Sequence, residues 1–261
     1  MTAPAPLLLG LLDDAALLSA SAPDLSASVR DHRAHRSGSL GSCLAALVVA
    51  DQQLGELGRI AGPPELSVLA VNTGGAGGLA ALGRRNLPGV QVVAVQSALR
   101  DLDDLAGNAA RVVSAARELP ESVEVYVELP DAAGWQRAVE VVEAAGLSAA
   151  VRAASLIGQR QGGPSDVALV EQLSGLVEAD LPFAVAGWDR SLAGLLLAVH
   201  GLVDGADGAD VVDLLSAPGA ASVVAGWDDQ DAARVRRRLR RVQCPDLASA
   251  TAELGPLLPV P

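Results

Sequence analysis

Polar and charged side chains stand where the predicted β-strands of this chain end. Six short apolar runs finish, in chain order, at Asp51, Asn72, Gln96, Glu128, Arg152 and Asp189. In parallel β/α folds, ligands bind at the carboxyl ends of the strands, where side chains from different strands converge. Carboxylates in such positions are suited to general acid–base catalysis or to holding a divalent cation through oxygen ligands. An arginine there is suited to holding a carboxylate or phosphate with its bidentate fork.

These residue types lead to two sets of expected roles. Glu128 and Asp189 are the expected catalytic residues, and the expected ligand-binding residues are Arg152, Asn72, Gln96 and Asp51. An ordinary structural role is the alternative for each of them, because strands commonly end in polar residues and an aspartate there can cap the following helix. The sequence assigns no metal ligand and no cofactor.

The clearest predicted strand is the stretch 123–130, Val-Glu-Val-Tyr-Val-Glu-Leu-Pro. Its apolar and polar residues alternate strictly, and alternate side chains of a strand point to opposite faces. The face that carries Glu124, Tyr126 and Glu128 is therefore opposite the valine face. If the valines pack under helices, Glu128 points into the mouth of a barrel.

The rest of the chain repeats this strand-and-helix pattern. Further strands are predicted at 44–50, 66–71, 90–95, 148–151 and 183–186, and a helical pattern follows each. Consecutive β/α units with right-handed crossovers produce a parallel sheet. A chain of 261 residues has the length of one (β/α) barrel, which takes roughly 250 residues. We therefore expect an α/β fold with a TIM-barrel-like parallel sheet, with an open doubly wound sheet as the alternative.

The two ends of the chain differ from this repeat. We expect one domain over 1–261, with a helical extension over about 1–40 and a helical tail over about 228–261. In the tail, a helix is predicted from Asp228 to Val242, because its apolar residues recur at three- and four-residue steps. A regular eight-stranded barrel needs two further strands, and the candidates are a run near Leu7 and the run Ser222 to Ala225.

Composition excludes several classes of function. The formal net charge of −12 argues against a nucleic-acid partner and against adsorption to anionic membranes. All nineteen basic residues are arginine, so the chain has no lysine for a Schiff base, for pyridoxal phosphate or for a Walker-type loop. The arginines of the segment 234–241 are expected mostly on the solvent side of the tail helix, where they favour its C-terminal dipole.

Cysteine use and hydropathy indicate the compartment. Cys43 and Cys244 form neither a metal-ligand pattern nor a disulfide framework, so a reduced, cytoplasmic protein is expected. No apolar run has the length of a transmembrane helix. The apolar helices are compatible with a homo-oligomer, and the strand-end arginine is compatible with a small anionic ligand.

Two other patterns favour structural roles. Gly75, Gly77 and Ala80 fit a relaxed dinucleotide fingerprint, but Gln96 stands where the acidic residue of that fingerprint is expected. The segment is therefore interpreted as a tight turn with a close backbone approach. The histidines are few: His32 and His35 lie in a polar helix and are expected at the surface, and His200 is expected to be buried.

Five stretches of the second half form a further pattern, and they are 150–154, 186–190, 190–194, 243–244 and 254–258. In order, they resemble the motifs Lys-Leu-Arg-x-Gly-Gly, Ala-Gly-Leu-His-His and His-Gly-Phe-Leu-Asn, then a Ser-Cys segment and a Leu-Gly-Leu-Leu ending. These motifs belong to a poorly characterised bacterial family of TIM-barrel-like proteins, which this chain resembles. Arg152, Gly187 and Cys244 match, whereas the lysine, the histidines and the asparagine of the motifs do not.

The resemblance implies a barrel-like fold and a diverged member that has lost most motif residues. Two functions therefore stay open. The first is a small-molecule lyase or isomerase that uses strand-end carboxylates without a Schiff base. The second is a non-catalytic barrel that binds a ligand or a partner protein.

Overall fold

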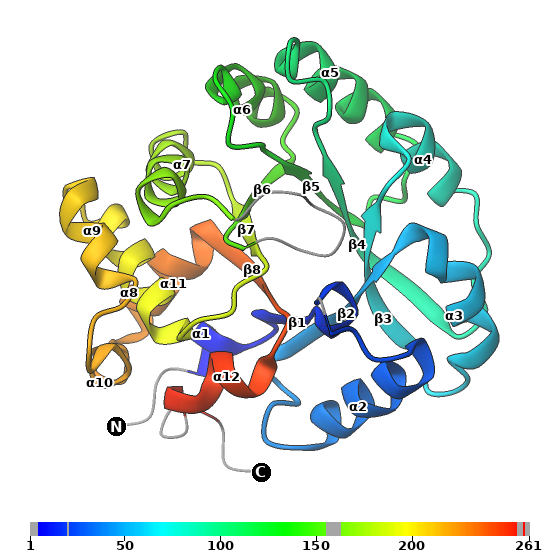
Figure 1. Ribbon diagram of the computed structural model, residues 1–261, viewed down its shortest axis with the longest axis horizontal. Helices are drawn as coiled ribbons and strands as arrows, with labels where there is room; N and C mark the ends of the chain where they lie inside the picture. Colours follow the sequence, from blue (N-terminus) through cyan, green and yellow to red (C-terminus); the bar gives the residue numbers. More distant parts are fainter. Residues whose placement is uncertain (1–4, 20, 155–162, 255–257, 259–261) are drawn as a thin grey trace.

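Eight parallel strands close into a barrel in the computed structural model, which describes residues 5–19, 21–154, 163–254 and 258 (Figure 1). The strands pair in chain order, and β8 returns to β1. They are β1 (Leu12–Asp14), β2 (Leu44–Ala50), β3 (Leu66–Asn72), β4 (Val90–Ala98), β5 (Glu124–Glu128), β6 (Ser148–Arg152), β7 (Phe183–Ala186) and β8 (Leu239–Cys244). The expected TIM-barrel-like α/β fold is confirmed, and the open doubly wound sheet is excluded.

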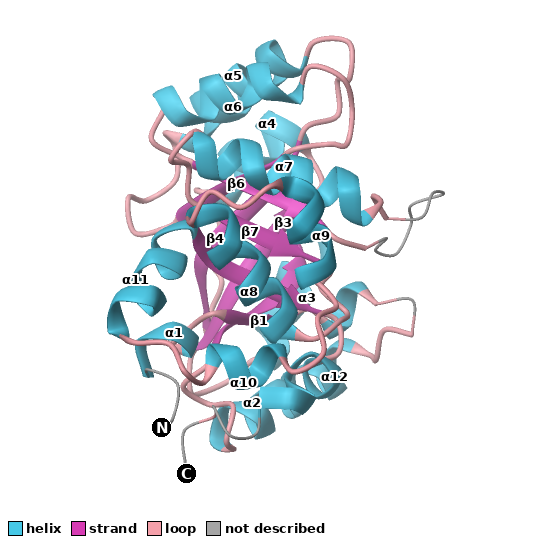
Figure 2. Ribbon diagram, turned by 90° about the vertical axis from the view of Figure 1, so that its left-hand side faces the viewer, coloured by secondary structure: helices cyan, strands magenta, loops and turns pink. Residues whose placement is uncertain are grey.

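Helices surround this sheet (Figure 2). The α-helices are α1 (Ala5–Leu8), α2 (Leu25–Ser37), α3 (Leu54–Ile60), α4 (Gly75–Leu82), α5 (Leu105–Ala116), α6 (Trp135–Ala144), α7 (Asp166–Glu178), α8 (Leu192–Val203), α9 (Gly208–Leu214), α10 (Ala220–Val224), α11 (Asp229–Arg238) and α12 (Leu247–Thr251). Three short 3₁₀ turns are η1 (Ala16–Leu18), η2 (Asp51–Gln53) and η3 (Ala252–Leu254). Asp24 caps α2 as expected, accepting a hydrogen bond of 2.7 Å from the backbone N–H of Ala27.

Two apolar cores follow from the alternation of the strands. The larger core lies between the barrel and its helices, and Val127 and Val151 belong to it. The smaller core fills the barrel interior and consists of Ala15, Ala46, Val48, Leu69, Ala94, Tyr126, Ala150 and Ala184. Most of these inner residues are small, which leaves room inside the barrel for longer polar side chains at other positions.

The two end strands differ from their predicted positions. The first strand is Leu12–Asp14 rather than a run near Leu7, and Ser222–Ala225 is not a strand, since α10 covers most of it. The predicted helix from Asp228 to Val242 is wrong beyond Arg238, because Leu239–Cys244 forms β8. Both end strands carry inward-facing charged residues, which hide the apolar alternation of a strand.

The arginines of α11 and β8 are mostly engaged by neighbours. Arg234 pairs with Asp204, and Arg237 pairs with Asp180 at 2.7 Å. Arg236 instead donates to the carbonyls of Leu239 and Arg240, at 3.0 and 2.9 Å. Arg241 is buried, contrary to the predicted solvent side.

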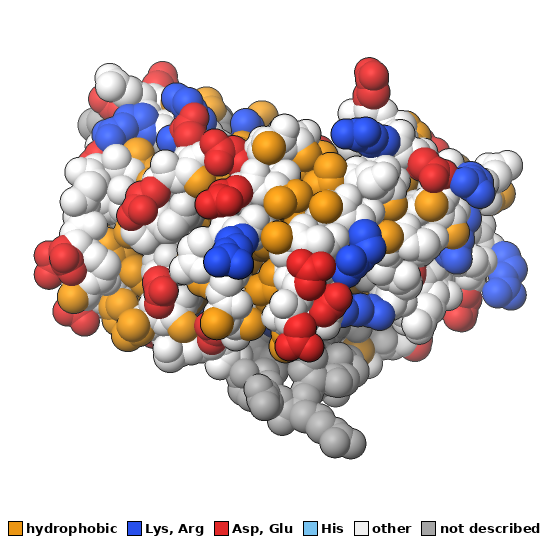
Figure 3. All heavy atoms as spheres, turned by 90° about the horizontal axis from the view of Figure 1, so that it is seen from above, with side chains coloured by type: hydrophobic (Ala, Val, Ile, Leu, Met, Phe, Trp, Pro, Cys, Tyr) orange, Lys and Arg blue, Asp and Glu red, His pale blue; other side chains and the backbone are white. Residues whose placement is uncertain are grey.

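On the face that carries α5 and α6, arginine and acidic side chains are intermixed (Figure 3).

The helices of the described segments are too short or too polar to cross a bilayer. The longest described helices, α2 and α7, have 13 residues each, which is well short of the roughly 20 apolar residues that a membrane requires.

Candidate functional site

Glu128 is the last residue of β5 and faces the barrel interior. Tyr126 lies in the inner core and Val127 in the outer core, so the two faces of the strand are as the alternation predicts. Glu128 is buried, with 6% of its surface exposed. The predicted orientation of Glu128 into the mouth of the barrel is thereby confirmed.

Arg152, at the end of the neighbouring strand β6, forms an ion pair with Glu128. Its Nε donates to Glu128 Oε1 at 2.9 Å, and its Nη2 donates to the same oxygen. The other carboxylate oxygen, Oε2, accepts a hydrogen bond of 2.6 Å from Gln96 Nε2. Both oxygens of Glu128 are therefore bound by donors, and the contact with Arg152 is a charge-assisted one.

Gln96 lies inside the barrel rather than at a strand end, because β4 continues to Ala98. It is buried, and its side-chain carbonyl accepts a hydrogen bond from the amide of Gln243 in β8. The sequence indicates no role for Gln243 in a site, because the helix predicted over 228–242 hides the strand that carries this residue. The result is a chain of polar contacts from Gln243 through Gln96 and Glu128 to Arg152.

A cavity of about 1060 Å³ lies at this end of the barrel, and Glu128 and Arg152 line it. Its walls also include segments that follow β2, β3 and β4, together with residues of η1. The polar lining residues are Gln52, Gln53, Asn72, Thr73, Arg100, Glu128, Asp131, Arg152, Ser165 and Gln172. A polar cavity at the carboxyl ends of the strands is where ligands bind in barrels of this type.

Asn72 lines this cavity, but its side chain holds the following turn. Its Nδ2 donates to the carbonyl of Gly75 at 2.7 Å and to Ser97 Oγ at 2.9 Å. Its Oδ1 accepts from the N–H of Gly74 at 3.1 Å. The glycine-rich segment is the tight turn that the sequence predicts, and Asn72 is a structural part of it.

Asp51 follows β2 directly and is buried beside the same turn. Its Oδ1 accepts a hydrogen bond of 2.5 Å from Thr73 Oγ1, and Arg85 donates to its backbone carbonyl at 2.8 Å. Its neighbours Ala50 and Gln52 line the cavity, whereas Asp51 does not. Asp51 therefore ties the loop after β2 to the loop after β3.

Asp189 is exposed and does not line the cavity. The residues beside it fix the segment after β7: Trp188 is wholly buried, and its Nε1 donates to the carbonyl of Ser191 at 3.2 Å. Of the three carboxylates at predicted strand ends, only Glu128 lines the cavity.

The histidines take part in structural contacts. His32 is buried, contrary to the predicted surface position, and its Nδ1 lies 3.2 Å from Asp14 Oδ2. His200 is largely buried as expected, stacks on Trp227 with ring centroids 4.6 Å apart, and lies 3.3 Å from Asp231. Over the described ranges, no cluster of three or more His, Cys, Asp or Glu side chains is arranged to hold a metal ion.

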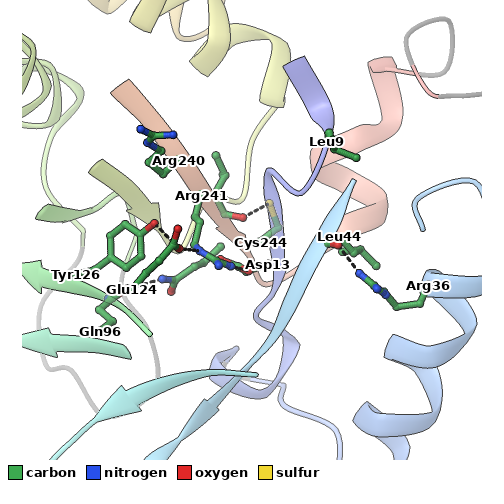
Figure 4. Close-up of polar contacts among 12 residues, drawn as sticks. Leu9, Asp13, Arg36, Leu44, Gln96, Glu124, Tyr126, Arg240, Arg241 and Cys244 are labelled. Carbon is green, nitrogen blue, oxygen red and sulfur yellow. Dashed lines mark hydrogen bonds and ion pairs between the residues drawn. The ribbon is translucent and has the colours of Figure 1, made fainter. Parts of the chain in front are cut away.

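A second charged cluster lies deeper in the barrel (Figure 4). Arg241 Nη1 donates to Asp13 Oδ1 at 2.9 Å, and its Nε donates to Glu124 Oε2 at 2.8 Å. The Tyr126 hydroxyl donates to the same Glu124 oxygen at 3.0 Å. Burial, together with the nearby Glu124 charge, raises the pKa of Tyr126 above its usual range, so this hydroxyl remains a donor.

No family model and no curated protein matches this chain. Part of the ending that resembles the bacterial barrel family, residues 255–257, lies outside the described residues. The site must therefore be interpreted from its own chemistry.

Proposed function

We propose that the barrel mouth binds a small anionic molecule and that Arg152 recognises its carboxylate or phosphate group. The observation that carries this proposal is the position of Arg152. Its side chain lines the cavity, and Glu128 binds the guanidinium group through Nε and Nη2. The pair with Glu128 uses Nε and Nη2, and Nη1 takes no part in it. An anion that approaches from the cavity is therefore met by an oriented cation.

The dimensions of the cavity support a small-molecule ligand. Its volume of about 1060 Å³ is at the upper end of the range of roughly 300–1000 Å³ that is typical of ligand pockets. Apolar residues line it beside the polar ones, among them Leu18, Val71 and Leu99. A molecule with one anionic group and an apolar or hydroxylated body fits this lining.

A lyase or isomerase that uses Glu128 is the second candidate function. Its support is the place of Glu128 at the carboxyl end of a barrel strand, where the catalytic residues of such barrels lie. If an anionic substrate takes over Arg152, Glu128 loses its ionic partner and becomes available as a proton acceptor. Binding is favoured over catalysis because Asp51 and Asp189 do not line the cavity and both oxygens of Glu128 are already bound.

The wider setting belongs to the same proposal. Cys43 and Cys244 are both free and buried, which fits a cytoplasmic protein. Membership of the bacterial barrel family that the second half resembles fits the closed barrel. The absence of lysine limits either function to chemistry without a Schiff base.

The test is a thermal-shift screen of the purified protein with phosphorylated sugars, small carboxylic acids and nucleotides. A ligand at a hundred times its Kd adds about 2.7 kcal/mol, which corresponds to a midpoint shift of about 5–10 °C for a chain of this size. Arg152→Ala is expected to abolish the shift. Arg84→Ala, which removes an exposed pair with Glu118, is the matched control and is expected to keep it.

Glu128→Gln separates the two candidate functions. In either case Arg152 loses its ionic partner, so the ligand shift is expected to weaken. Only in a lyase or isomerase does the variant also abolish turnover of the ligand that the screen identifies. A ligand shift that persists unchanged in Arg152→Ala would contradict the proposed anion site.

A further inference from the structure

Asp13 carries an unpartnered oxygen in the interior of the barrel. It lies on β1 and is wholly buried. Its Oδ1 accepts the hydrogen bond from Arg241, whereas its Oδ2 has no hydrogen-bond partner in the part of the chain that the structure describes. A buried acceptor without a donor loses the hydrogen bonds to water that it makes in the unfolded chain, so this atom requires an explanation.

Gln243 carries a second unpartnered oxygen beside it. Asp13 and Gln243 are directly paired residues of β1 and β8, so their side chains leave the sheet next to each other on the same face. Gln243 is also wholly buried, and within the described residues its Oε1 has no donor. Two residues at paired positions of adjacent strands thus each carry a buried acceptor without a donor.

Glu128, at the mouth of the barrel, fixes the orientation of the Gln243 amide through Gln96. An ionised carboxylate only accepts hydrogen bonds, so Glu128 requires the Nε2 group of Gln96 to face it. The Gln96 carbonyl then faces Gln243, which must present its own Nε2. The carbonyl of Gln243 is left to find a donor elsewhere, because turning either amide alone would place two like groups in contact.

The local charge count also favours a proton at this position. Arg241 is the cation that pairs with both Asp13 and Glu124, and Arg236 lies close enough to interact with Glu124 as well. The Glu124 side chain is half exposed, whereas Asp13 is fully enclosed and shares Arg241 with it. An ionised Asp13 would hold its charge away from water with only a shared cation, which is unfavourable.

We propose that Asp13 holds a proton in the folded protein and donates it from Oδ2 to Gln243 Oε1. A relay of hydrogen bonds then runs from Asp13 through the amides of Gln243 and Gln96 to Glu128. Every member of this relay has a partner, and its last donor, Gln96, binds Glu128 beside Arg152. Asp13, Gln243 and Gln96 are positioning residues for the mouth.

The electrostatic environment of Asp13 is consistent with this. Burial raises its pKa from 3.8 to about 6, against the lowering effect of Arg241. The groups that face it are Arg241 from β8, Glu124 from β5 and the backbone N–H of Ala46 from β2, with Tyr126 and the buried thiol of Cys244 close by. A hydrogen bond from the neutral acid to Gln243 would raise the pKa further.

Ionisation of Asp13 would change the state of the mouth. When its proton passes to solvent, two acceptors face each other, and the strain is relieved if both amides turn over. Turned over, Gln96 presents its carbonyl to Glu128 Oε2, which then loses its donor, so the state of Asp13 is transmitted to the mouth. The effect on a ligand at Arg152 rests on the proposed function, whereas the proton on Asp13 does not.

The experiment compares Asp13→Asn with Asp13→Ala and with the unaltered protein, without ligand. Asparagine reproduces the neutral acid, since its Oδ1 accepts from Arg241 and its Nδ2 donates to Gln243. At pH 8 we expect the thermal midpoint of Asp13→Asn to equal or exceed that of the unaltered protein, and Asp13→Ala to melt lower at every pH.

The proposal also predicts the direction in which stability changes with pH. Because the pKa of Asp13 is raised on folding, its contribution is fully present below about pH 4 and is lost as the pH rises through about 6. The midpoint of the unaltered protein should therefore fall over this window relative to that of Asp13→Asn.

The carbon-13 chemical shifts of aspartate carboxyl groups report directly whether each group is protonated. The resonance that is missing from the spectrum of Asp13→Asn is assigned to Asp13. We expect it to titrate near pH 6 or above. Titration at or below the usual value of 3.8 would overturn the proposal, and so would a folding defect of Asp13→Asn as severe as that of Asp13→Ala. A bound water or cation would then occupy the space between the two oxygens.

Discussion

Asn72 shows how a residue that lines a ligand cavity can be committed to the fold. Both ends of its amide bind the turn after β3, and the backbone approaches it closely at Gly78. A Cβ atom on Gly78 would lie 2.2 Å from Asn72 Oδ1, which is far inside van der Waals contact. Glycine is therefore required at 78 by the position of a side chain, although its own backbone is helical.

Two glycines of α4 make this a controlled test. Gly77 has open space around its would-be Cβ, so Gly77→Ala should stabilise the helix by about 0.5–1 kcal/mol. Gly78→Ala should instead destabilise the protein, because the asparagine must move and its hydrogen bonds are lost. Urea unfolding of the two variants measures the difference. Equal stabilisation by both would show that Asn72 is not held in place.

The contact between 72 and 78 also predicts non-additivity. Asn72→Ala alone should cost about 1–3 kcal/mol, because buried donors and acceptors of the turn lose their partners. In that background the clash no longer exists, so Gly78→Ala should become neutral or stabilising. A double-mutant cycle should therefore give a coupling of about 0.5–3 kcal/mol, and strictly additive effects would contradict this geometry.

Among the elements, β8 shows why part of the site could not be predicted. Ala232, Val235, Leu239 and Val242 recur at helical steps, but the chain changes from helix to strand at Leu239. Inside the strand, Arg241 faces inward and hides the alternation. Its partner Asp13 is 228 residues away, so no local pattern reveals that the two charges are buried together.

The strands that alternate cleanly were predictable, and so was the chemistry they position. The sequence of β5 placed Glu128 on the inner face, and the end of β6 placed Arg152 next to it. What the pattern did not reveal is which strand-end residues line the cavity. Asp51 does not line it and binds Thr73, whereas Asn72 lines it but its amide holds the following turn, because loop geometry decides which groups they meet.

Helix α11, which leads into β8, begins with a capping box. Asp228 accepts hydrogen bonds from the N–H groups of Gln230 and Asp231, at 2.8 and 2.9 Å, and Asp231 accepts from the N–H of Asp228 in return. Asp228→Ala should cost about 0.5–2 kcal/mol in chemical denaturation, whereas Asp228→Asn should retain most of the stability.

Asp229→Ala is the control for charge alone. Asp229 lies in the first turn of α11, so its replacement removes a favourable dipole interaction of about 0.3–1 kcal/mol but no cap. If Asp228→Asn lost as much stability as Asp228→Ala, the charge rather than the cap would be responsible.

At the scale of the whole molecule, the barrel closes through its shortest strand. β1 has three residues, and it pairs with three residues of β2 and three of β8, with an irregularity on the β2 side. By contrast, β3 and β4 are paired over seven positions. The ion pair of Asp13 and Arg241 joins β1 to β8, so the first residue of the proposed relay also contributes to closing the barrel.

Because the seam has few ladder hydrogen bonds, we expect the barrel to open there first. Native-state hydrogen exchange tests this on the amides of Leu12, Ala15 and Val242. Their hydrogen bonds of 2.8 to 2.9 Å join the segment of β1 to its neighbours on either side, and these amides are called the seam amides. They should exchange through an opening whose free energy and denaturant dependence are below those of global unfolding, whereas central amides of β3 and β4 should require global unfolding. If the seam amides shared the protection of β3 and β4, the closed barrel would unfold as one unit, and Asp13 would be reached by solvent only when the whole fold is lost.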